Sequence, residues 1–373
     1  MKTAIIISNQ FHHYKAAKRL GPGLKKHSAT DLVSFCEFRR QRTPEDASDY
    51  FTAVKRIIPR MLFGSSKNLG AGSLGHGFSG KRKLLHWFLS VFLAPIIFFR
   101  LLGYSKIVLF NDNAFPNTLT IKIARLLRAR ILLIQEGIRF MTPIEAKAID
   151  RLYGTSELDA ILVWGDYFKR YFTEIRKSEQ GIYVTGCISQ EVAEAASYSG
   201  GEAILIATNP IDDLGYCTTA DKLELVRKLV SAIRSADRAV KILIKNHPRE
   251  NTSVYREMCK DFTEVTVLDS TLTMAAALRL ADRCICFAST AGLEAIQAGK
   301  VLGVVKVGNW DYAFNYIAEG GGYPIDLSSA RCPEMMAAFL EATYGEHEQS
   351  YLDKMFYKPD DLTECFVETI SSI

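Results

Sequence analysis

The sequence lacks the cysteine spacing of a metal site or a disulfide framework. Its eight cysteines are scattered over 373 residues without a Cys-x-x-Cys pair, and no histidine stands at metal-ligand spacing from them. Reduced thiols in a cytosolic protein fit this distribution better than zinc or disulfides. The net charge of +5 is too small to indicate a general nucleic-acid-binding role. The first apolar run is too short for a signal peptide and predicts a buried strand.

Acidic residues are absent from one long stretch, residues 50–111, which carries nine Lys and Arg residues. Within it a Lys-Arg-Lys cluster at 81–83 leads into the apolar run 84–99. A membrane-spanning helix needs about 20 apolar residues, and this run is shorter and contains Pro95. Two interpretations stay open. The run is either a helix buried in the core, or part of an element Lys81–Phe99 that lies in a bilayer surface with its basic residues on anionic head groups.

Short apolar runs alternate with helical patterns along most of the chain. Residues 107–110 and 131–134 are strand-like, and an amphipathic helix is predicted between them at 118–130. A strand, a helix and a strand joined by short connections predict a βαβ unit and therefore a parallel sheet. The small, Gly- and Ser-rich segment 195–201 is typical of a crossing between domains.

The alternation starts again at 203–207 and continues to a last predicted strand at 301–307. We therefore predict an α/β protein of two Rossmann-like domains, residues 1–187 and 188–373, whose parallel sheets face a central cleft. C-terminal helices follow, and the last of them could cross back to the first domain.

A polar cluster follows the strand-like run 241–244 in the second half. It consists of Lys245, Asn246, His247 and Pro248, and the proline cannot continue a ladder of hydrogen bonds. His247 therefore stands just past the carboxyl end of a strand, the edge where open α/β sheets bind ligands. Lys, Asn and His at this edge favour an anion such as phosphate. A surface turn with a solvated histidine is the plainer interpretation.

The segment Ser289-Thr290-Ala291-Gly292 is a second candidate for phosphate binding, because a predicted strand gives way there to a helix. Free N–H groups and the positive dipole end of a helix hold phosphate, and hydroxyl groups add donors. An ordinary N-cap by Ser289 or Thr290 would produce the same pattern.

Three further residues of the second half are candidates for nucleotide contacts. Glu294, on the same predicted helix, either reaches ribose hydroxyls or lies on a solvated helix face. Thr208 and Asn209 follow the strand-like run 203–207 and are expected near the base.

In the first half, the run 131–134 ends in Gln135-Glu136-Gly137. Glu136 thus stands at a carboxyl edge beside a glycine, which lets a ligand or another backbone come close. It is either a functional carboxylate or a structural cap of the next segment. Candidates for acceptor binding, together with Gly137, are the polar residues after other predicted strands: His12 and His13, in a loop predicted over 8–14, and Asn111 and Asp112.

Taken together, Gln135-Glu136-Gly137, His247-Pro248 and Ser289-Thr290 resemble the three motifs of bacterial sialyltransferases and polysialyltransferases, which are GT-B glycosyltransferases. Those motifs are acidic-acidic-glycine, His-Pro and serine-rich, and they come in the same order and in the expected halves. The last two also resemble strand ends of capsular Kdo transferases and CDP-glycerol glycerophosphotransferases. The first acidic position is Gln135 here, so only Glu136 is left to be the base.

The resemblance implies an inverting glycosyltransferase that uses a CMP-activated sugar, of the sialic acid or Kdo type, to extend capsule or lipopolysaccharide. Glu136 would take the proton of the acceptor hydroxyl. His247 would stabilise the leaving phosphate, together with the hydroxyls of Ser289 and Thr290. No Asp-x-Asp occurs in the chain, so we expect a reaction without metal or cofactor. Its expected partners are a nucleotide-sugar donor and a glycan acceptor, with no nucleic acid, at the cytoplasmic face of the plasma membrane.

A related transferase, an enzyme of another class and a non-enzymatic role remain as alternatives. A CDP-glycerol-type transferase would move a polyol phosphate, with the chemistry at phosphorus. A UDP-N-acetylglucosamine 2-epimerase shares the two-domain layout, but it has little use for the acid-free apolar stretch. A capsule-assembly scaffold would bind no nucleotide.

Overall fold

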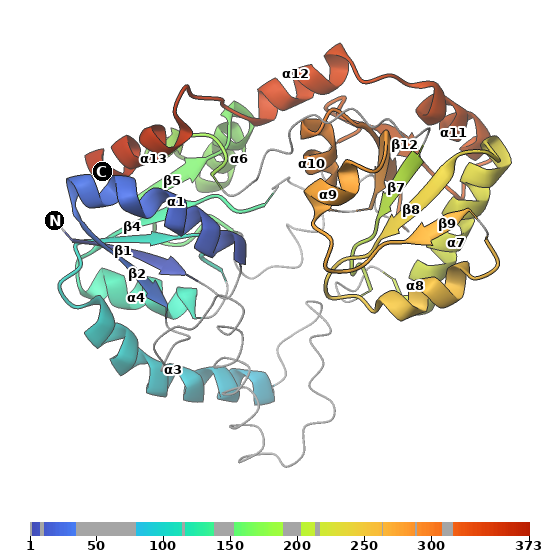
Figure 1. Ribbon diagram of the computed structural model, residues 1–373. Helices are drawn as coiled ribbons and strands as arrows, with labels where there is room; N and C mark the ends of the chain where they lie inside the picture. The colour runs from blue at the N-terminus through green and yellow to red at the C-terminus, as the bar shows by residue number, and fades with distance from the viewer. Residues whose placement is uncertain are drawn as a thin grey trace.

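A computed structural model of the protein describes residues 2–7, 11–34, 80–113, 116–137, 153–188, 203–212, 217–262, 264–287, 289–307 and 316–373. For residues 7, 11, 12, 15, 34 and 80–89 it gives the course of the backbone alone. These residues form two lobes, each built on a parallel sheet of six strands (Figure 1). The predicted α/β class with two parallel, Rossmann-like sheets is confirmed.

The first lobe contains the strands β1 (Lys2–Ile7), β2 (Ala29–Ser34), β3 (Lys106–Leu109), β4 (Arg130–Ile134), β5 (Ala160–Val163) and β6 (Ile182–Val184). Its helices are α1 (Phe11–His27), α3 (Gly80–Leu101), α4 (Asn117–Leu126) and α6 (Asp166–Arg176). The strand order is β2-β1-β3-β4-β5-β6. The direction in which strands are added therefore reverses between β1 and β3, and ligands of such sheets bind at this switch point.

The second lobe contains the strands β7 (Ala203–Ala207), β8 (Lys241–Lys245), β9 (Val265–Val267), β10 (Arg283–Cys286), β11 (Val301–Val305) and β12 (Tyr323–Ile325). Its helices are α7 (Thr219–Ala236), α8 (Thr252–Cys259), α9 (Met274–Leu278), α10 (Ala291–Gln297) and α11 (Cys332–Glu341). The strand order β12-β11-β10-β7-β8-β9 places the switch point between β7 and β10.

Helices cover both faces of each sheet, which explains why the strands are continuous apolar runs. In β4, Ile131 and Leu133 belong to the core cluster that includes α3 and α4. Leu132 and Ile134 point to the other face, into the cluster with α1 and the last helix, α13 (Leu362–Ser372). Figure 1 shows these helix pairs on opposite sides of the sheet.

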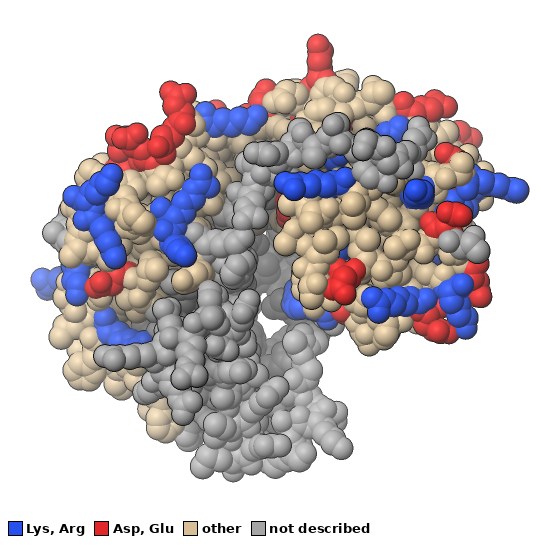
Figure 2. Space-filling view, viewed as in Figure 1, with Lys and Arg blue, Asp and Glu red and all other residues tan. Residues whose placement is uncertain are grey.

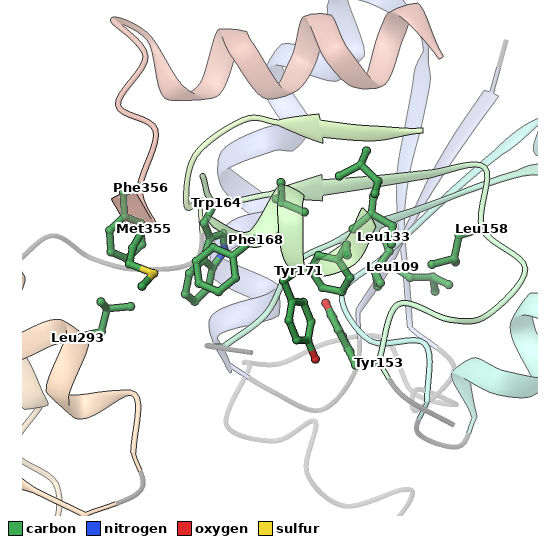
Figure 3. Close-up of a cluster of buried hydrophobic side chains, with 14 of the residues drawn as sticks. Leu109, Leu133, Tyr153, Leu158, Trp164, Phe168, Tyr171, Leu293, Met355 and Phe356 are labelled. Atoms are coloured by element: carbon green, nitrogen blue, oxygen red, sulfur yellow. The ribbon is translucent and has the colours of Figure 1, made fainter. Parts of the chain in front are cut away.

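The C-terminal chain connects the two lobes. After α11, α12 (Glu346–Met355) packs against α6 of the first lobe and α10 of the second. Beyond α12 the Phe356 ring stacks on Trp164, with centroids 5.6 Å apart and planes at 20°. Met355, Leu293 of α10 and Phe168 of α6 lie in the same core cluster (Figure 3). One continuous apolar core therefore joins the lobes, and α13 then packs on α1.

Three sequence-based expectations differ from the structure. The loop predicted over 8–14 is wrong from Phe11 onward, where α1 begins. The strand predicted as the last one ends at Val305, and β12 follows it. No helix is predicted where α12 lies, because its sequence is mostly polar. The domain boundary at 187/188 stays a prediction, between the end of β6 and the start of β7.

Gly165 offers a test of the crossing between the lobes. A Cβ added there would lie 2.4 Å from the Met355 carbonyl oxygen, whereas one at Gly345 finds nothing closer than 4.0 Å. Both glycines are N-cap residues, of α6 and α12, with φ of −168° and −161° respectively, so both alanine variants lose the N-cap preference of glycine. Gly165→Ala should lower the unfolding free energy by about 1–3 kcal/mol more than Gly345→Ala, measured by urea denaturation. Equal stabilities would contradict this close contact.

Candidate active site

Three neighbouring strands of the first sheet lead to polar residues at one edge. β1 is followed by α1 with His13, β3 by Asn111, and β4 by Glu136. The carboxyl ends of adjacent parallel strands lie side by side, and here the side chains are in direct contact. His13 Nε2 is hydrogen-bonded to Glu136 Oε2, and Asn111 Nδ2 donates to Glu136 Oε1 at 2.7 Å.

The surroundings of Glu136 hold both its side chain and its main chain. The residue is 7% exposed, and its N–H donates to the Tyr153 hydroxyl at 2.9 Å. That hydroxyl lies 3.1 Å from the carbonyl oxygens of Phe110 and Ile134, and the His13 ring stacks on Phe110. Because a hydrogen bond between an imidazole nitrogen and a carboxylate oxygen needs one proton, His13 and Glu136 share it as a pair.

Gln135, which stands where the resemblance expects an acid, has a different structural role. Its side chain is fully buried and bridges β4 to β5. Gln135 Oε1 accepts the main-chain N–H of Trp164 at 3.1 Å, while Gln135 Nε2 donates to the Gly137 carbonyl at 3.2 Å. A carboxylate could accept the first bond but could not donate the second. An amide is therefore the group that this position requires.

The other first-lobe candidates divide into contact residues and scaffold residues. Asn111 belongs to the Glu136 cluster, but Asp112 is fully buried and accepts the N–H groups of Gly154 and Ser156 at 3.0–3.2 Å. Asp112 thus has no exposed surface with which to bind an acceptor as predicted. Its carboxylate instead holds the loop that contains Gly154 and Ser156. His12 lies on α1, with its side chain outside the described part.

The second sheet repeats this arrangement at the strands β10, β7 and β8, which are adjacent and parallel. Ser289 and Thr290 follow β10, Thr208 and Asn209 follow β7, and His247 follows β8. The predicted phosphate-binding and base-binding residues are therefore gathered at one carboxyl edge around the switch point.

The turn that carries His247 is organised by Glu250, for which the sequence predicts no role. The Glu250 carboxylate accepts the His247 N–H at 2.8 Å, the Thr208 hydroxyl at 2.5 Å and the Tyr255 hydroxyl at 2.7 Å. The Arg249 N–H donates to His247 Nδ1 at 3.2 Å. A neutral His247 ring therefore carries its proton on Nε2, the nitrogen that can donate to a ligand.

A buried ion network supports this turn from below. Lys222 Nζ lies 2.8 Å from Glu250 and 2.6 Å from Asp212, and its side chain is 7% exposed. Burial alone would raise the pKa of Glu250, but the hydrogen bonds from Lys222, Thr208 and Tyr255 outweigh it and lower that pKa. The two carboxylates in turn raise the pKa of Lys222 against the opposing effect of its burial. All three groups are therefore held in their charged forms.

Several residues predicted to touch the nucleotide stabilise the turn itself. Lys245 is buried, and its Nζ donates to the carbonyl oxygens of Asn246 and Ser270 at 3.0 and 3.2 Å. Asn246 is fully buried and donates to the carbonyls of His247 and Glu250. Thr208 is buried against Glu250, whereas Asn209 is half-buried and Pro248 is exposed.

The Ser289 segment forms a tight entry to α10. Ser289 Oγ accepts the Ala291 N–H at 3.2 Å, a bond between a side chain and a nearby main-chain group. The N-cap residue of α10 is Thr290, whose side chain makes no capping bond. A Cβ on Gly292 would meet Cys286 Sγ and Tyr316 Cζ at 2.9 Å. This glycine therefore allows α10 to pack closely on the core, and Glu294 is half-buried on the same helix.

One contact across the lobes brings the two groups of residues together. Gly137 has φ +66°, which favours glycine, and a Cβ built on it would lie 4.0 Å from Thr290 Cγ2. The residue after Glu136 and the residue after Ser289 therefore face each other across the boundary between the lobes. Together these two edges form the candidate site.

Two observations concern the rest of the described chain. Among the residues that the structure describes, no cluster of three or more His, Cys, Asp or Glu residues could hold a metal ion. A cavity of about 860 Å³ lies at the amino ends of β7 and β10, beside α11. It is thus at the edge of the second sheet opposite His247 and Ser289.

No protein-family model and no curated protein sequence matches the chain. Solved structures do. UDP-GlcNAc 2-epimerase from Neisseria meningitidis, bound to UDP-GlcNAc, aligns with a TM-score of 0.62 at 12% identity over 100% of both chains. MurG from Acinetobacter baumannii aligns with a TM-score of 0.55 at 12% identity, over 100% of this chain and 99% of its own. The spinosyn rhamnosyltransferase SpnG aligns with a TM-score of 0.54 at 15% identity, over 95% of both chains.

The chain has the GT-B fold. Solved structures of glycosyltransferases and of an epimerase with the same pair of Rossmann-like lobes align with nearly the whole chain. At these identities the likeness concerns the fold, because one fold hosts many reactions.

The buried network offers a test that uses two lysines of the same helix. Lys222→Met removes the cation between Asp212 and Glu250 and leaves two buried carboxylates without it. We expect a loss of about 3–5 kcal/mol in unfolding free energy. Lys228→Met, at an exposed position of α7, should change it by less than about 0.5 kcal/mol. Urea denaturation measures both, and similar small losses would show that the network contributes little.

Proposed function

We propose that the protein is an inverting glycosyltransferase that transfers a sugar from a nucleotide donor to a cell-surface glycan, without a metal ion. The observation that carries this proposal is the approach of Gly137 to Thr290, which sets the Glu136 edge of one lobe against the Ser289–Thr290 edge of the other. Such a boundary can hold an acceptor on one side and a nucleotide phosphate on the other.

In this reaction the His13–Glu136 pair takes up the proton of the acceptor hydroxyl. The acceptor oxygen attacks the anomeric carbon as the bond from that carbon to the donor phosphate breaks, and the bonding electrons leave with the phosphate. Asn111 holds the Glu136 carboxylate and Tyr153 holds its main-chain N–H, so little reorganisation is needed when the proton moves.

The leaving phosphate gains negative charge in the transition state. His247 Nδ1 accepts the Arg249 N–H, so a neutral ring carries its proton on Nε2, and this N–H would donate to a phosphate oxygen. The hydroxyls of Ser289 and Thr290 would add donors from the neighbouring strand end. A CMP-activated sugar of the sialic acid or Kdo type is the donor that the sequence motifs favour.

A second candidate is a UDP-N-acetylglucosamine 2-epimerase-like activity. The similarity to the UDP-GlcNAc 2-epimerase of Neisseria meningitidis, at a TM-score of 0.62 over both full chains, favours it. Inverting C2 of a sugar requires removal of the C2 proton, and the buried His13–Glu136 pair offers a base for that step as well. The donor base and the product distinguish the two candidates.

Calorimetric titration with CMP, CDP, UMP and UDP, in EDTA and then in magnesium, tests the proposal first. We expect CMP to bind equally well in both, with transfer from a CMP-sugar to an acceptor glycan. Glu136→Gln should bind CMP normally and lose about 10²- to 10⁴-fold in turnover. Tighter binding of UDP than of CMP, with an epimerised UDP-sugar as product, would favour the epimerase-like activity over the transferase. Absence of any nucleotide binding would refute both.

The leaving-group role of His247 is tested by two alanine variants. His247→Ala should lower kcat by about 10²-fold or more with the CMP-sugar, because a transition-state donor is lost. His347→Ala, at an exposed position of α12, should leave kcat unchanged. Steady-state kinetics and a thermal melt of each variant separate chemistry from unfolding. Normal turnover by a folded His247→Ala protein would exclude the role.

A further inference from the structure

The described part of α3 has two opposite apolar faces. Leu93, Ile97 and Leu101 are buried in the first lobe, at 7, 0 and 0% exposure. On the other side, Val91, Phe92 and Phe99 are 51, 61 and 72% exposed, and Leu102, directly after the helix, is 57% exposed. At 100° per residue these four positions fall within an arc of about 100°. We call these four residues the α3 face.

This clustering is unusual within the described surface. Ten large hydrophobic residues are exposed there, and the four of the α3 face lie within twelve residues of one another, while the others are scattered over both lobes. Single exposed apolar residues are ordinary, but a contiguous group marks a contact surface. The interpretation of the run as a buried helix holds for one side of α3, because the other side is exposed. The contact with a bilayer surface stays a prediction.

The charge around the α3 face narrows the choice of partner. The stretch 50–111 has nine Lys and Arg residues and no acid. It includes Lys81, Arg82 and Lys83 at the start of α3 and the exposed Arg100 at its end. In Figure 2 most of the acidic side chains in view lie along the upper edge near α13 and on the second lobe, and one lies among basic side chains at the left of the first lobe. A second copy of the chain would bring the same positive charge against itself, whereas an anionic surface complements it.

The geometry of α3 suits contact along a bilayer surface. None of the described helices is long and apolar enough to cross a membrane. α3 has 22 residues, so it is about 33 Å long, and its buried face fixes it along the lobe. Aromatic side chains on one side and cations at the ends are the features of helices that lie in the head-group region.

We propose that the α3 face docks this protein on anionic phospholipid bilayers. Phe92 and Phe99 enter the boundary of the acyl chains, and the flanking basic residues contact the lipid phosphates. The proposal is independent of the substrate, because the α3 face lies outside the candidate site. It does, however, fit an acceptor that is carried by a membrane.

Co-sedimentation with phosphatidylcholine vesicles, with and without about one third phosphatidylglycerol, tests this. We expect binding to the anionic vesicles that weakens from 0.1 to 0.5 M salt, since screening shortens the electrostatic reach. Phe92→Ser/Phe99→Ser should weaken it about 10-fold or more, because two apolar insertions are lost. The matched double variant Val254→Ser/Leu280→Ser, at exposed positions of the second lobe, should bind as the wild type does.

Two further measurements secure the interpretation. Light scattering reports the oligomeric state, and a dimer that Phe92→Ser/Phe99→Ser converts to a monomer without vesicle binding would assign the α3 face to a second copy instead. Hydrogen exchange should show added protection of α3, and none of α8, when anionic vesicles are present. Absence of vesicle binding by the wild type, or equal binding by both double variants with unchanged melting temperatures, would overturn the proposal.

Discussion

The packing of Trp164 is the constraint on which the rest of the structure depends. This fully buried ring stacks on Phe356 of the returning chain, while its Nε1–H donates to the Gln135 carbonyl at 3.1 Å. Its own carbonyl accepts the Tyr357 N–H at 2.7 Å. One residue thus fixes the exit of β4, directly before Glu136, and the path by which the C-terminal chain joins the two lobes. The buried carboxylate and the relation between the lobes share a single support.

The two edges of the candidate site are stabilised by different kinds of interaction. In the first lobe Glu136 is held by hydrogen bonds to Asn111 and Tyr153 and by a histidine stacked on Phe110. In the second lobe the position of His247 depends on a buried ion network, in which Lys222 neutralises Asp212 and Glu250. Removing one partner of such a network is far more damaging than removing an exposed pair. Glu136 and His247 are therefore each placed by side chains of their own lobe, Glu136 by hydrogen bonds and a stacked ring and His247 by a turn that rests on buried charges.

The sequence predicts those parts of the fold that repeat a local pattern. β4, β7, β8 and β10 are apolar runs that stop at polar residues, so both the sheets and the strand ends of the site follow from short-range signals. α1 is hidden because Gly21, Pro22 and Gly23 interrupt its pattern. β12 has three residues and contains proline at the edge of a sheet. Contacts between distant residues leave weaker signals. Lys222 stands in register with Val226, Leu229 and Ile233 on the buried side of α7, which marks a buried cation but does not name its partners.

The approach of Gly137 to Thr290 has a consequence for how the specificity of this protein can evolve. The two halves of the site meet at main-chain positions, a glycine on one side and the entry to a short helix on the other. Under the proposed function, the residues that select the sugar acceptor and those that select the nucleotide are encoded in separate lobes. Either set can be replaced while the opposite edge and the aromatic joint between the lobes stay intact. A fold divided in this way can acquire a new specificity one half at a time.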